Sequence, residues 1–245
     1  DETSTSWTVG ANWMFADKKG VFVRVSEGSK MPFFDDLREG KIDPQNVDQY
    51  ELGYKHSSDY FELYATGFFN EVTGDKFSPR PGAPIQVTTT EAYGVELDFS
   101  FFTDNGFSVA VGATLQQTEQ TESSSPENIG NEAARLPNWQ VRITPSYDFE
   151  FDNGLYGTLY GTISSAADRF SDNGNTDALI LESFTKIDLG VIVNVTDEVR
   201  MQLAVNNLTD EEGLTEGDPR GTSGILDNGR YILPRSVDFN VSYSF

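Results

Sequence analysis

Large apolar and small polar side chains alternate along most of this chain, and they do so without interruption through its last nine residues. Because a β-strand presents successive side chains on opposite faces, one face of this segment is apolar and the other is polar. The apolar face carries Val237, Phe239, Val241, Tyr243 and Phe245. The pattern therefore predicts a strand that ends the chain on an aromatic residue.

The same two-residue period predicts eleven strands in all, and no segment shows convincing helical periodicity. In one of them, Val95, Leu97 and Phe99 alternate with Glu96 and Asp98. The predicted strands cover residues 5–15, 20–27, 48–56, 59–71, 88–102, 106–119, 137–151, 154–168, 181–195, 198–208 and 230–245. The expected fold class is all-β and antiparallel.

The connections between these predicted strands alternate in length. Short turns follow the odd-numbered strands, at residues 16–19, 57–58, 103–105, 152–153 and 196–197. Long loops rich in Gly, Ser, Pro, Asp and Glu follow the even-numbered strands, at residues 28–47, 72–87, 120–136, 169–180 and 209–229. Two turns contain Asp-Asn-Gly, at 104–106 and 152–154, which favours tight hairpins because Asn and Gly accept a positive φ. Short turns on one rim and long loops on the other are typical of outer-membrane β-barrels.

The composition suits a thin apolar band built from alternate residues. Hydrophobic residues occupy only 37% of the 245 positions, yet aromatic residues reach 13%. The chain has no apolar run of about 18 residues or more, so it encodes no transmembrane helix. Residues 1–4 are neither basic nor apolar, so we expect no signal peptide within this sequence.

Charge and residue content exclude several kinds of chemistry. The net charge of −22 disfavours nucleic acid as a partner, because phosphate binding needs a surplus of Lys and Arg. Cysteine is absent, and the single histidine, His56, cannot by itself form a typical zinc site or a Ser-His-Asp triad. We expect His56 to be exposed beside a short turn. No catalytic residue, metal ligand or cofactor is therefore predicted.

An odd number of strands conflicts with a closed barrel. In an up-and-down barrel made by one bacterial chain, the first and last strands pair antiparallel, which requires an even number. An open edge cannot face lipid, because each unpaired backbone group there costs several kcal/mol. Eleven is half of about 22, the strand number of outer-membrane transporters with a plugged lumen. We therefore expect half of a 22-stranded transmembrane β-barrel.

Six segments resemble, in the correct order, parts of the barrel of TonB-dependent outer-membrane receptors. They are residues 21–28 with 31–37, Pro44 with 49–55, residues 90–97, residues 136–139, residues 203–210, and Arg230 with Tyr231. Residues 49–55 are similar to the family's Y-E-L-G-x-K stretch, and residues 203–210 to its V-x-N-L-F-D stretch. Phe33-Phe34 departs from the usual Phe-Arg, so an arginine contact is not carried over.

This resemblance implies active uptake of a scarce solute (a ferric siderophore, haem, cobalamin or an oligosaccharide) driven by TonB, and no enzymatic activity. It implies a location in the bacterial outer membrane. Residues 1–245 would form the wall and the extracellular loops of the C-terminal half of the barrel, without the plug domain and the N-terminal half. The expected partners are outer-membrane lipid, the protein's own plug and N-terminal barrel half, TonB, the barrel assembly machinery and a small-molecule solute.

Charged side chains on the polar faces of the predicted strands cannot face lipid at low cost, which points them toward a hydrated lumen. The candidates for contact with the plug or the solute are Arg24, Glu51, Lys55, Glu96, Asp98, Arg142, Lys186, Asp188 and Arg200. The simpler role for these residues is to form ion pairs between strands and to contact the plug. Direct contact with the solute is the alternative.

Aromatic residues suggest three further roles. Interfacial girdles are expected from Trp7, Trp13, Phe15, Trp139, Tyr147, Phe149, Tyr243 and Phe245. In the loops, Phe33, Phe34 and Phe77 are candidates for stacking on a sugar or a catecholate. The resemblance also implies that Phe239, Val241, Tyr243 and Phe245 form the signal that the assembly machinery reads.

The long loops carry more acidic than basic residues, which favours a neutral or cationic solute, such as a carbohydrate, over an anionic ferric siderophore. Residues 209–220 contain five carboxylates that could hold a hard cation, although a solvated acidic loop is the simpler interpretation. Two other classes stay open at this point. One is a soluble β-sandwich or lectin-like binding module, and the other is an acid/base glycosidase with two carboxylates about 5–10 Å apart.

Overall fold

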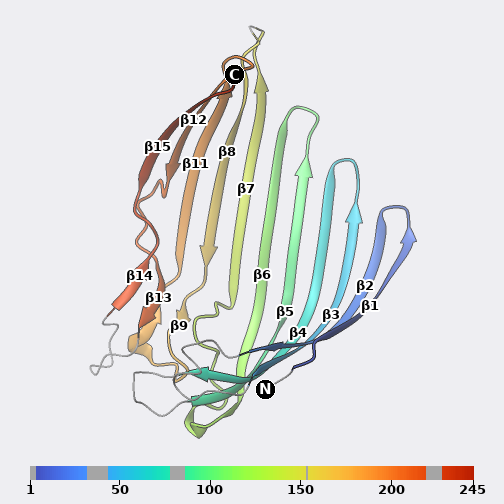
Figure 1. Ribbon diagram of the computed structural model, residues 1–245, viewed down its shortest axis with the longest axis vertical. Helices are drawn as coiled ribbons and strands as arrows, with labels where there is room; N and C mark the ends of the chain where they lie inside the picture. Colours follow the sequence, from blue (N-terminus) through green and yellow to red (C-terminus); the bar gives the residue numbers. More distant parts are fainter. Residues whose placement is uncertain (1–3, 32–43, 78–85, 153, 219–227) are drawn as a thin grey trace.

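The computed structural model describes residues 4–31, 44–77, 86–152, 154–218 and 228–245, and most of this chain is strand (Figure 1). The strands are β1 (Trp7–Ala16), β2 (Lys19–Lys30), β3 (Gln45–Ser57), β4 (Phe61–Phe77), β5 (Gln86–Phe102), β6 (Phe107–Ser123), β7 (Trp139–Glu150), β8 (Tyr156–Ala166), β9 (Arg169–Phe170), β10 (Ile180–Leu181), β11 (Phe184–Asn194), β12 (Val199–Asn206), β13 (Leu214–Asp218), β14 (Asn228–Tyr231) and β15 (Ser236–Tyr243). Two short 3₁₀ helices, η1 (Pro126–Asn128) and η2 (Asp177–Leu179), lie in loops. In these described ranges, no helix has the length and apolar character needed to cross a membrane.

Eleven strands form one sheet in the order β1-β2-β3-β4-β5-β6-β7-β8-β11-β12-β15. Every neighbouring pair is antiparallel, so the sheet is an up-and-down meander with β1 and β15 at its two edges (Figure 1). The tight turns lie at one end of the strands and the long loops at the other (Figure 1). We call this eleven-stranded sheet the wall. The prediction of an all-β antiparallel fold with eleven such strands is confirmed.

The two Asp-Asn-Gly turns form as predicted. Gly106 has a φ of 87° and Gly154 a φ of 81°, the left-handed region that favours glycine. The Thr103 amide donates to the Phe107 carbonyl at 2.9 Å in the first turn, and the Phe151 amide donates to the Leu155 carbonyl at 2.8 Å in the second. These bonds close the β5–β6 and β7–β8 hairpins.

The strand boundaries differ from the prediction at the loop end. β4 continues to Phe77 and β6 to Ser123, because backbone pairing extends past the apolar part of each strand, where the sequence pattern fades. The predicted strand 230–245 is also broken. Its first residues belong to β14, which pairs with β13, whereas the wall strand β15 begins only at Ser236. Pro234, which has no N–H to donate, lies between them.

The register gives the sheet one polar and one apolar face. Asp98 on β5 lies opposite Gly112 on β6, which lies opposite Arg142 on β7. The next residues along the same strands, Leu97, Ala113 and Val141, lie opposite one another on the other face. Because the strands are in register, polar residues lie next to polar residues, and apolar next to apolar, across neighbouring strands of the wall.

The apolar face is uncovered. Large side chains on it are mostly exposed to solvent: 67% for Trp13, 63% for Leu115 and 67% for Phe239. Among the described residues, the buried apolar side chains are Ala133, Ala167, Leu179 and Leu181, all of them outside the eleven-stranded sheet. A soluble sandwich would pack its apolar faces against each other, so this arrangement does not support that alternative. An exposed apolar band is the surface that a membrane β-barrel presents to lipid.

Aromatic rings gather on the apolar face near the tight turns. Ring centroids lie 5.7 Å apart for Trp13 and Phe15, 6.5 Å for Phe15 and Tyr54, and 6.3 Å for Tyr54 and His56. His56 also packs edge-on against Phe61 at 4.8 Å. The histidine is thus half-buried in a row of rings, and the expectation that it would be exposed beside the turn is wrong. The reason is that His56 shares the even-numbered face of β3 with Leu52 and Tyr54, which is the apolar face.

Candidate functional site

The polar face of the wall is the candidate functional surface. The strand register places every predicted lumen-facing residue on it, on strands β2, β3, β5, β7, β11 and β12. They are Arg24, Glu51, Lys55, Glu96, Asp98, Arg142, Lys186, Asp188 and Arg200. That they contact a plug or a solute stays a prediction.

Four of these nine residues form ion pairs within the wall. Arg24 and Glu51 lie opposite each other on β2 and β3 and form an ion pair, in which the Glu51 side chain is only 9% exposed. The Glu51 carboxylate also accepts a hydrogen bond from the Gln49 side-chain amide at 2.8 Å. On β11, Lys186 Nζ lies 2.8 Å from Asp188 Oδ2. These charges are neutralised by neighbours on the same surface.

The other five side chains have no such partner. In the described ranges, no side-chain hydrogen bond or ion pair engages Lys55, Glu96, Asp98, Arg142 or Arg200. All five lie on the face that alternation predicts to be hydrated. The wall therefore presents unpaired charges of both signs toward whatever occupies the space in front of it.

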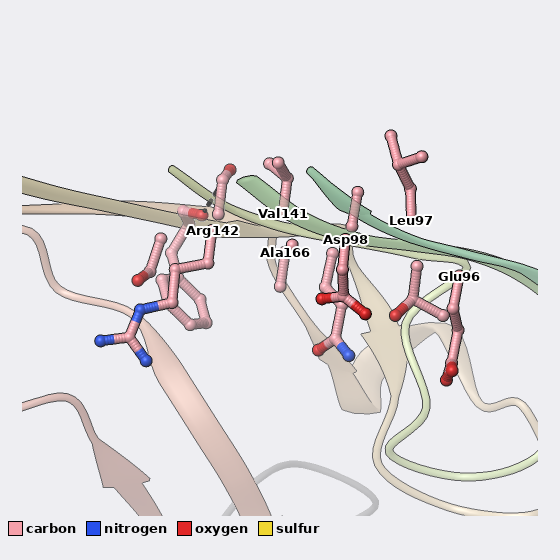
Figure 2. A pocket seen from close by; sticks show the side chains of 13 residues that line it. Glu96, Leu97, Asp98, Val141, Arg142 and Ala166 are labelled. Carbon is pink, nitrogen blue, oxygen red and sulfur yellow. Dashed lines mark hydrogen bonds between the residues drawn. The ribbon is translucent and has the colours of Figure 1, made fainter. Parts of the chain in front are cut away.

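A hollow with a volume of about 540 Å³ lies among three of these unpaired charges. We call it the wall hollow. On the polar face it is bounded by Glu96 and Asp98 from β5 and by Arg142 from β7, with Gly112 and Thr114 of β6 between them and Phe184 of β11 at its far side. Figure 2 shows Glu96, Asp98 and Arg142 on one side of the sheet, whereas Leu97 and Val141 point to the other.

The loops at the end of the wall are hydrogen-bonded into one unit, which we call the loop cluster: the described residues of 124–138, 167–183 and 207–235. Gln120, fully buried at the end of β6, donates from its side-chain amide to the carbonyls of Asn173 at 2.9 Å and Glu132 at 3.0 Å. Asn175 donates to the same Glu132 carbonyl at 3.0 Å and accepts from the Glu132 amide at 2.7 Å. Arg135 Nη1 donates to Glu216 Oε1 at 2.8 Å. Among the described residues, the buried apolar side chains lie in this loop cluster.

Asn207 closes the last loop and was not predicted as a site residue. Its side-chain amide donates to the carbonyls of Glu211 and Leu233 at 3.0 Å each, and its side-chain oxygen accepts from the Glu211 amide at 2.9 Å. Its own backbone amide donates to Asp188 Oδ1 at 2.8 Å, which ties the loop to the wall. Asn207 is fully buried with a φ of 50°, a conformation that Asn tolerates better than most residues.

Two acidic residues of the 209–220 loop, Asp210 and Glu216, form ion pairs with arginines. Asp210 Oδ1 accepts from the Arg235 amide at 2.9 Å, and Asp210 Oδ2 lies 3.7 Å from Arg235 Nη2. Glu216 lies between two arginines, 2.8 Å from Arg135 and 3.1 Å from Arg230. Among the described residues, no group of three or more His, Asp or Glu side chains is placed to hold a metal ion.

Arg169 joins two loops of the cluster from a buried position. It is 7% exposed, and Nη2 donates to the carbonyls of Leu214 at 3.0 Å and Thr215 at 3.2 Å. The guanidinium carbon lies 5.9 Å from the centre of the Phe184 ring. Burial lowers the pKa of Arg169 from its ordinary value. Arg169, on β9, therefore links β9 to β13 and also contacts Phe184, the first residue of β11.

We expect Arg169→Met to loosen the β13–β14 hairpin by about 1–3 kcal/mol, because two partly buried carbonyls lose their charged donor. Hydrogen exchange of the hairpin amides in the full-length receptor measures the effect. Arg230→Met is the matched control, because Arg230 makes its ion pair with Glu216 from a side chain that is 82% exposed, and such pairs contribute about 0–1 kcal/mol. Equal exchange in both variants would contradict the role given to Arg169.

The remaining predicted residues are apolar or aromatic. Phe33 and Phe34 are outside the described residues. Phe77 is the last residue of β4, at the loop end. Phe239, Val241 and Tyr243 lie on the exposed apolar face of the edge strand β15, and the Phe245 ring packs 6.4 Å from that of Tyr243. Their role as an assembly signal stays a prediction.

The wall, with its lipid-type face, its polar face and its loop cluster, has the features of part of an outer-membrane β-barrel. Residues 1–208 match the family described as "TonB dependent receptor-like, beta-barrel". The chain belongs to this family of receptors, which are outer-membrane β-barrels of Gram-negative bacteria, and the predicted family and location are confirmed.

Individual relatives agree with this assignment. The chain is 27% identical over 158 residues to the ferrichrome receptor FcuA of Yersinia enterocolitica, a match that covers 62% of this chain and 19% of that protein. It is similar in structure to the ferric yersiniabactin uptake receptor FyuA of Yersinia pestis (TM-score 0.80, 18% identity, 97% of this chain and 37% of that one). It is also similar to BauA, the ferric preacinetobactin receptor of Acinetobacter baumannii (TM-score 0.77, 22% identity, 97% and 36%). The chain thus spans well under half the length of these proteins.

Proposed function

We propose that this chain is the C-terminal half of the barrel of a receptor that takes up a ferric siderophore across the outer membrane, driven by TonB. The observation that carries the proposal is the two-faced wall: lipid-type residues on one face, and on the other a set of unpaired charges beneath a hydrogen-bonded loop cluster. A hydrated path through the membrane needs both faces.

Two further observations support the proposal. The edge strands β1 and β15 each pair on one side only, so the wall needs further strands to face lipid without unpaired backbone groups. These strands would come from the N-terminal half of the barrel, and the plug of the same protein would stand in front of the polar face. TonB would act through the plug, and the assembly machinery through β15.

The choice of solute rests on the names of the relatives. The three proteins compared above are named for ferrichrome, ferric yersiniabactin and ferric preacinetobactin. These names favour an iron chelate over the carbohydrate that the acidic loops favour, with ferrichrome as the first candidate. The family is one of receptors, which supports the absence of enzymatic activity.

Uptake of radioactive iron tests the proposal. The gene for the full-length protein is expressed in an iron-starved Gram-negative host without other siderophore receptors, and ⁵⁵Fe-ferrichrome and ⁵⁵Fe-yersiniabactin are supplied. We expect uptake of at least one chelate, and its loss when the host lacks TonB. Uptake that persists without TonB would contradict the energy source. Uptake of maltooligosaccharides and of neither chelate would contradict the solute class.

A further inference from the structure

We propose that the wall hollow is a binding slot for a zwitterionic arm of the solute, with an ammonium group held by Glu96 and Asp98 and a carboxylate held by Arg142. The inference rests on the proposed function, since it names the class of chelate that the receptor takes. It predicts a ferric chelate that carries a free amino-acid-like group on its periphery.

The strand register sets the two sides of the slot. Asp98 and Arg142 occupy one row of the polar face with Gly112 between them, so their strands are separated by about 10 Å, twice the usual strand spacing. Gly112 has no side chain to fill the space between Asp98 and Arg142. A Cβ at this position would lie in van der Waals contact with Asp98 Oδ1, at 3.7 Å. The hollow is therefore wide and shallow, with carboxylates along one side and a guanidinium along the other (Figure 2).

Within the described residues, a ligand would displace no partner from the charges of the slot. Glu96, Asp98 and Arg142 have no side-chain hydrogen bond or ion pair within the described chain, whereas nearby wall charges are paired as Arg24–Glu51 and Lys186–Asp188. An ammonium group between two carboxylates forms charge-assisted hydrogen bonds, which are about twice as strong as neutral ones. A purely anionic arm would face two carboxylates and one arginine, so a ligand with both charges is favoured.

The slot also lies where the loop cluster meets the wall. Phe184, at its far side, is the first residue of β11, and its ring lies beneath Arg169. Gly213 packs so closely on Phe184 that an added Cβ would come within 2.6 Å of the ring. The loops that rise from the wall are thus in direct contact with one side of the slot.

Four ferric trihydroxamates with the same core test the proposal. Their pendant arms end in an ammonium group, a carboxylate, an α-amino-acid group or a neutral amide, and their Kd values are measured on the purified full-length receptor. We expect the amino-acid arm to bind about tenfold more tightly than the amide arm, the effect of one good charged hydrogen bond. Asp98→Asn should abolish the preference for the ammonium group, and Arg142→Gln the preference for the carboxylate.

Asp104→Asn is the matched control, because Asp104 carries the same charge in the tight turn that joins β5 to β6, at the other end of the strands. It should keep the wild-type order of affinities. Four equal affinities would overturn the slot and leave the proposed function standing. Binding of none of the four would also overturn the slot, and only a failure to take up either chelate in the uptake experiment would overturn the proposed function as well. Unchanged preferences in Asp98→Asn and Arg142→Gln, together with a lower melting temperature of the ligand-free receptor, would overturn the slot by showing that the receptor itself fills it.

Discussion

Leu97→Arg is expected to destabilise the receptor in its membrane by about 2–4 kcal/mol, the cost of an arginine on the lipid face near the midplane. Leu97 lies on the apolar face of β5 between Tyr93 and Phe99, in the central part of the band. The measurement is the urea midpoint of the purified full-length receptor in phospholipid vesicles. The amount of heat-modifiable receptor in outer-membrane fractions should fall in parallel.

Thr66→Arg is the control for this prediction. Thr66 lies on the polar face of β4, directly opposite Glu96, and one residue along from the partner of Leu97. An arginine there would face water and a carboxylate, so we expect a change in stability below about 1 kcal/mol. If both arginines destabilise the receptor equally, the assignment of the two faces is wrong.

Asn207→Ala is expected to cost about 3–5 kcal/mol, because three partly buried backbone groups lose their partner and alanine is strained at a positive φ. The amide and carbonyl of Glu211 and the carbonyl of Leu233 are the groups left unpaired. Because the backbone amide of Asn207 also bonds Asp188, the loop should separate from the wall. Faster hydrogen exchange through 208–213 and 232–235, together with a lower urea midpoint, would report this change.

Asn206→Ala separates this effect from a general loss of an asparagine. On the polar face, Asn206 donates to the exposed residues Ser236, at Oγ and 3.2 Å, and Asp238, at Oδ2 and 2.7 Å. Its partners can bond water instead, so we expect a change of about 1 kcal/mol or less. A similar cost for both variants would contradict the role of Asn207 as the clamp of this loop.

The wall could be predicted from the sequence because its strands follow a simple two-residue alternation of polar and apolar side chains. Alternation such as Glu96-Leu97-Asp98 assigns each side chain to a face, and Asp-Asn-Gly marks the hairpins that set the register. The charged residues of the polar face follow from the same rule. The rule also holds for His56, whose surroundings are set by the face of β3 to which it belongs and not by its position beside a turn.

The loop cluster could not be predicted in this way, since it follows no period. The contacts of Gln120 with Asn173 and of Arg169 with Leu214 join residues 53 and 45 positions apart through single backbone carbonyls. The break at Pro234 showed a signal, a proline inside a predicted strand, that should have shortened that strand. Asn207 and Asp210 showed another, because Asn and Asp favour the left-handed conformations that both adopt.

The two-faced wall can be tested most directly by the accessibility of single cysteines at residues 93–99 of β5 in the assembled receptor. The described chain contributes no cysteine of its own, so each label reports one position. With a spin label at each site, we expect odd-numbered positions to be accessible to oxygen dissolved in lipid and even-numbered positions to a water-soluble nickel chelate. Equal access of the nickel chelate to both sets would contradict a lipid-facing wall, and with it the membrane receptor that the wall defines.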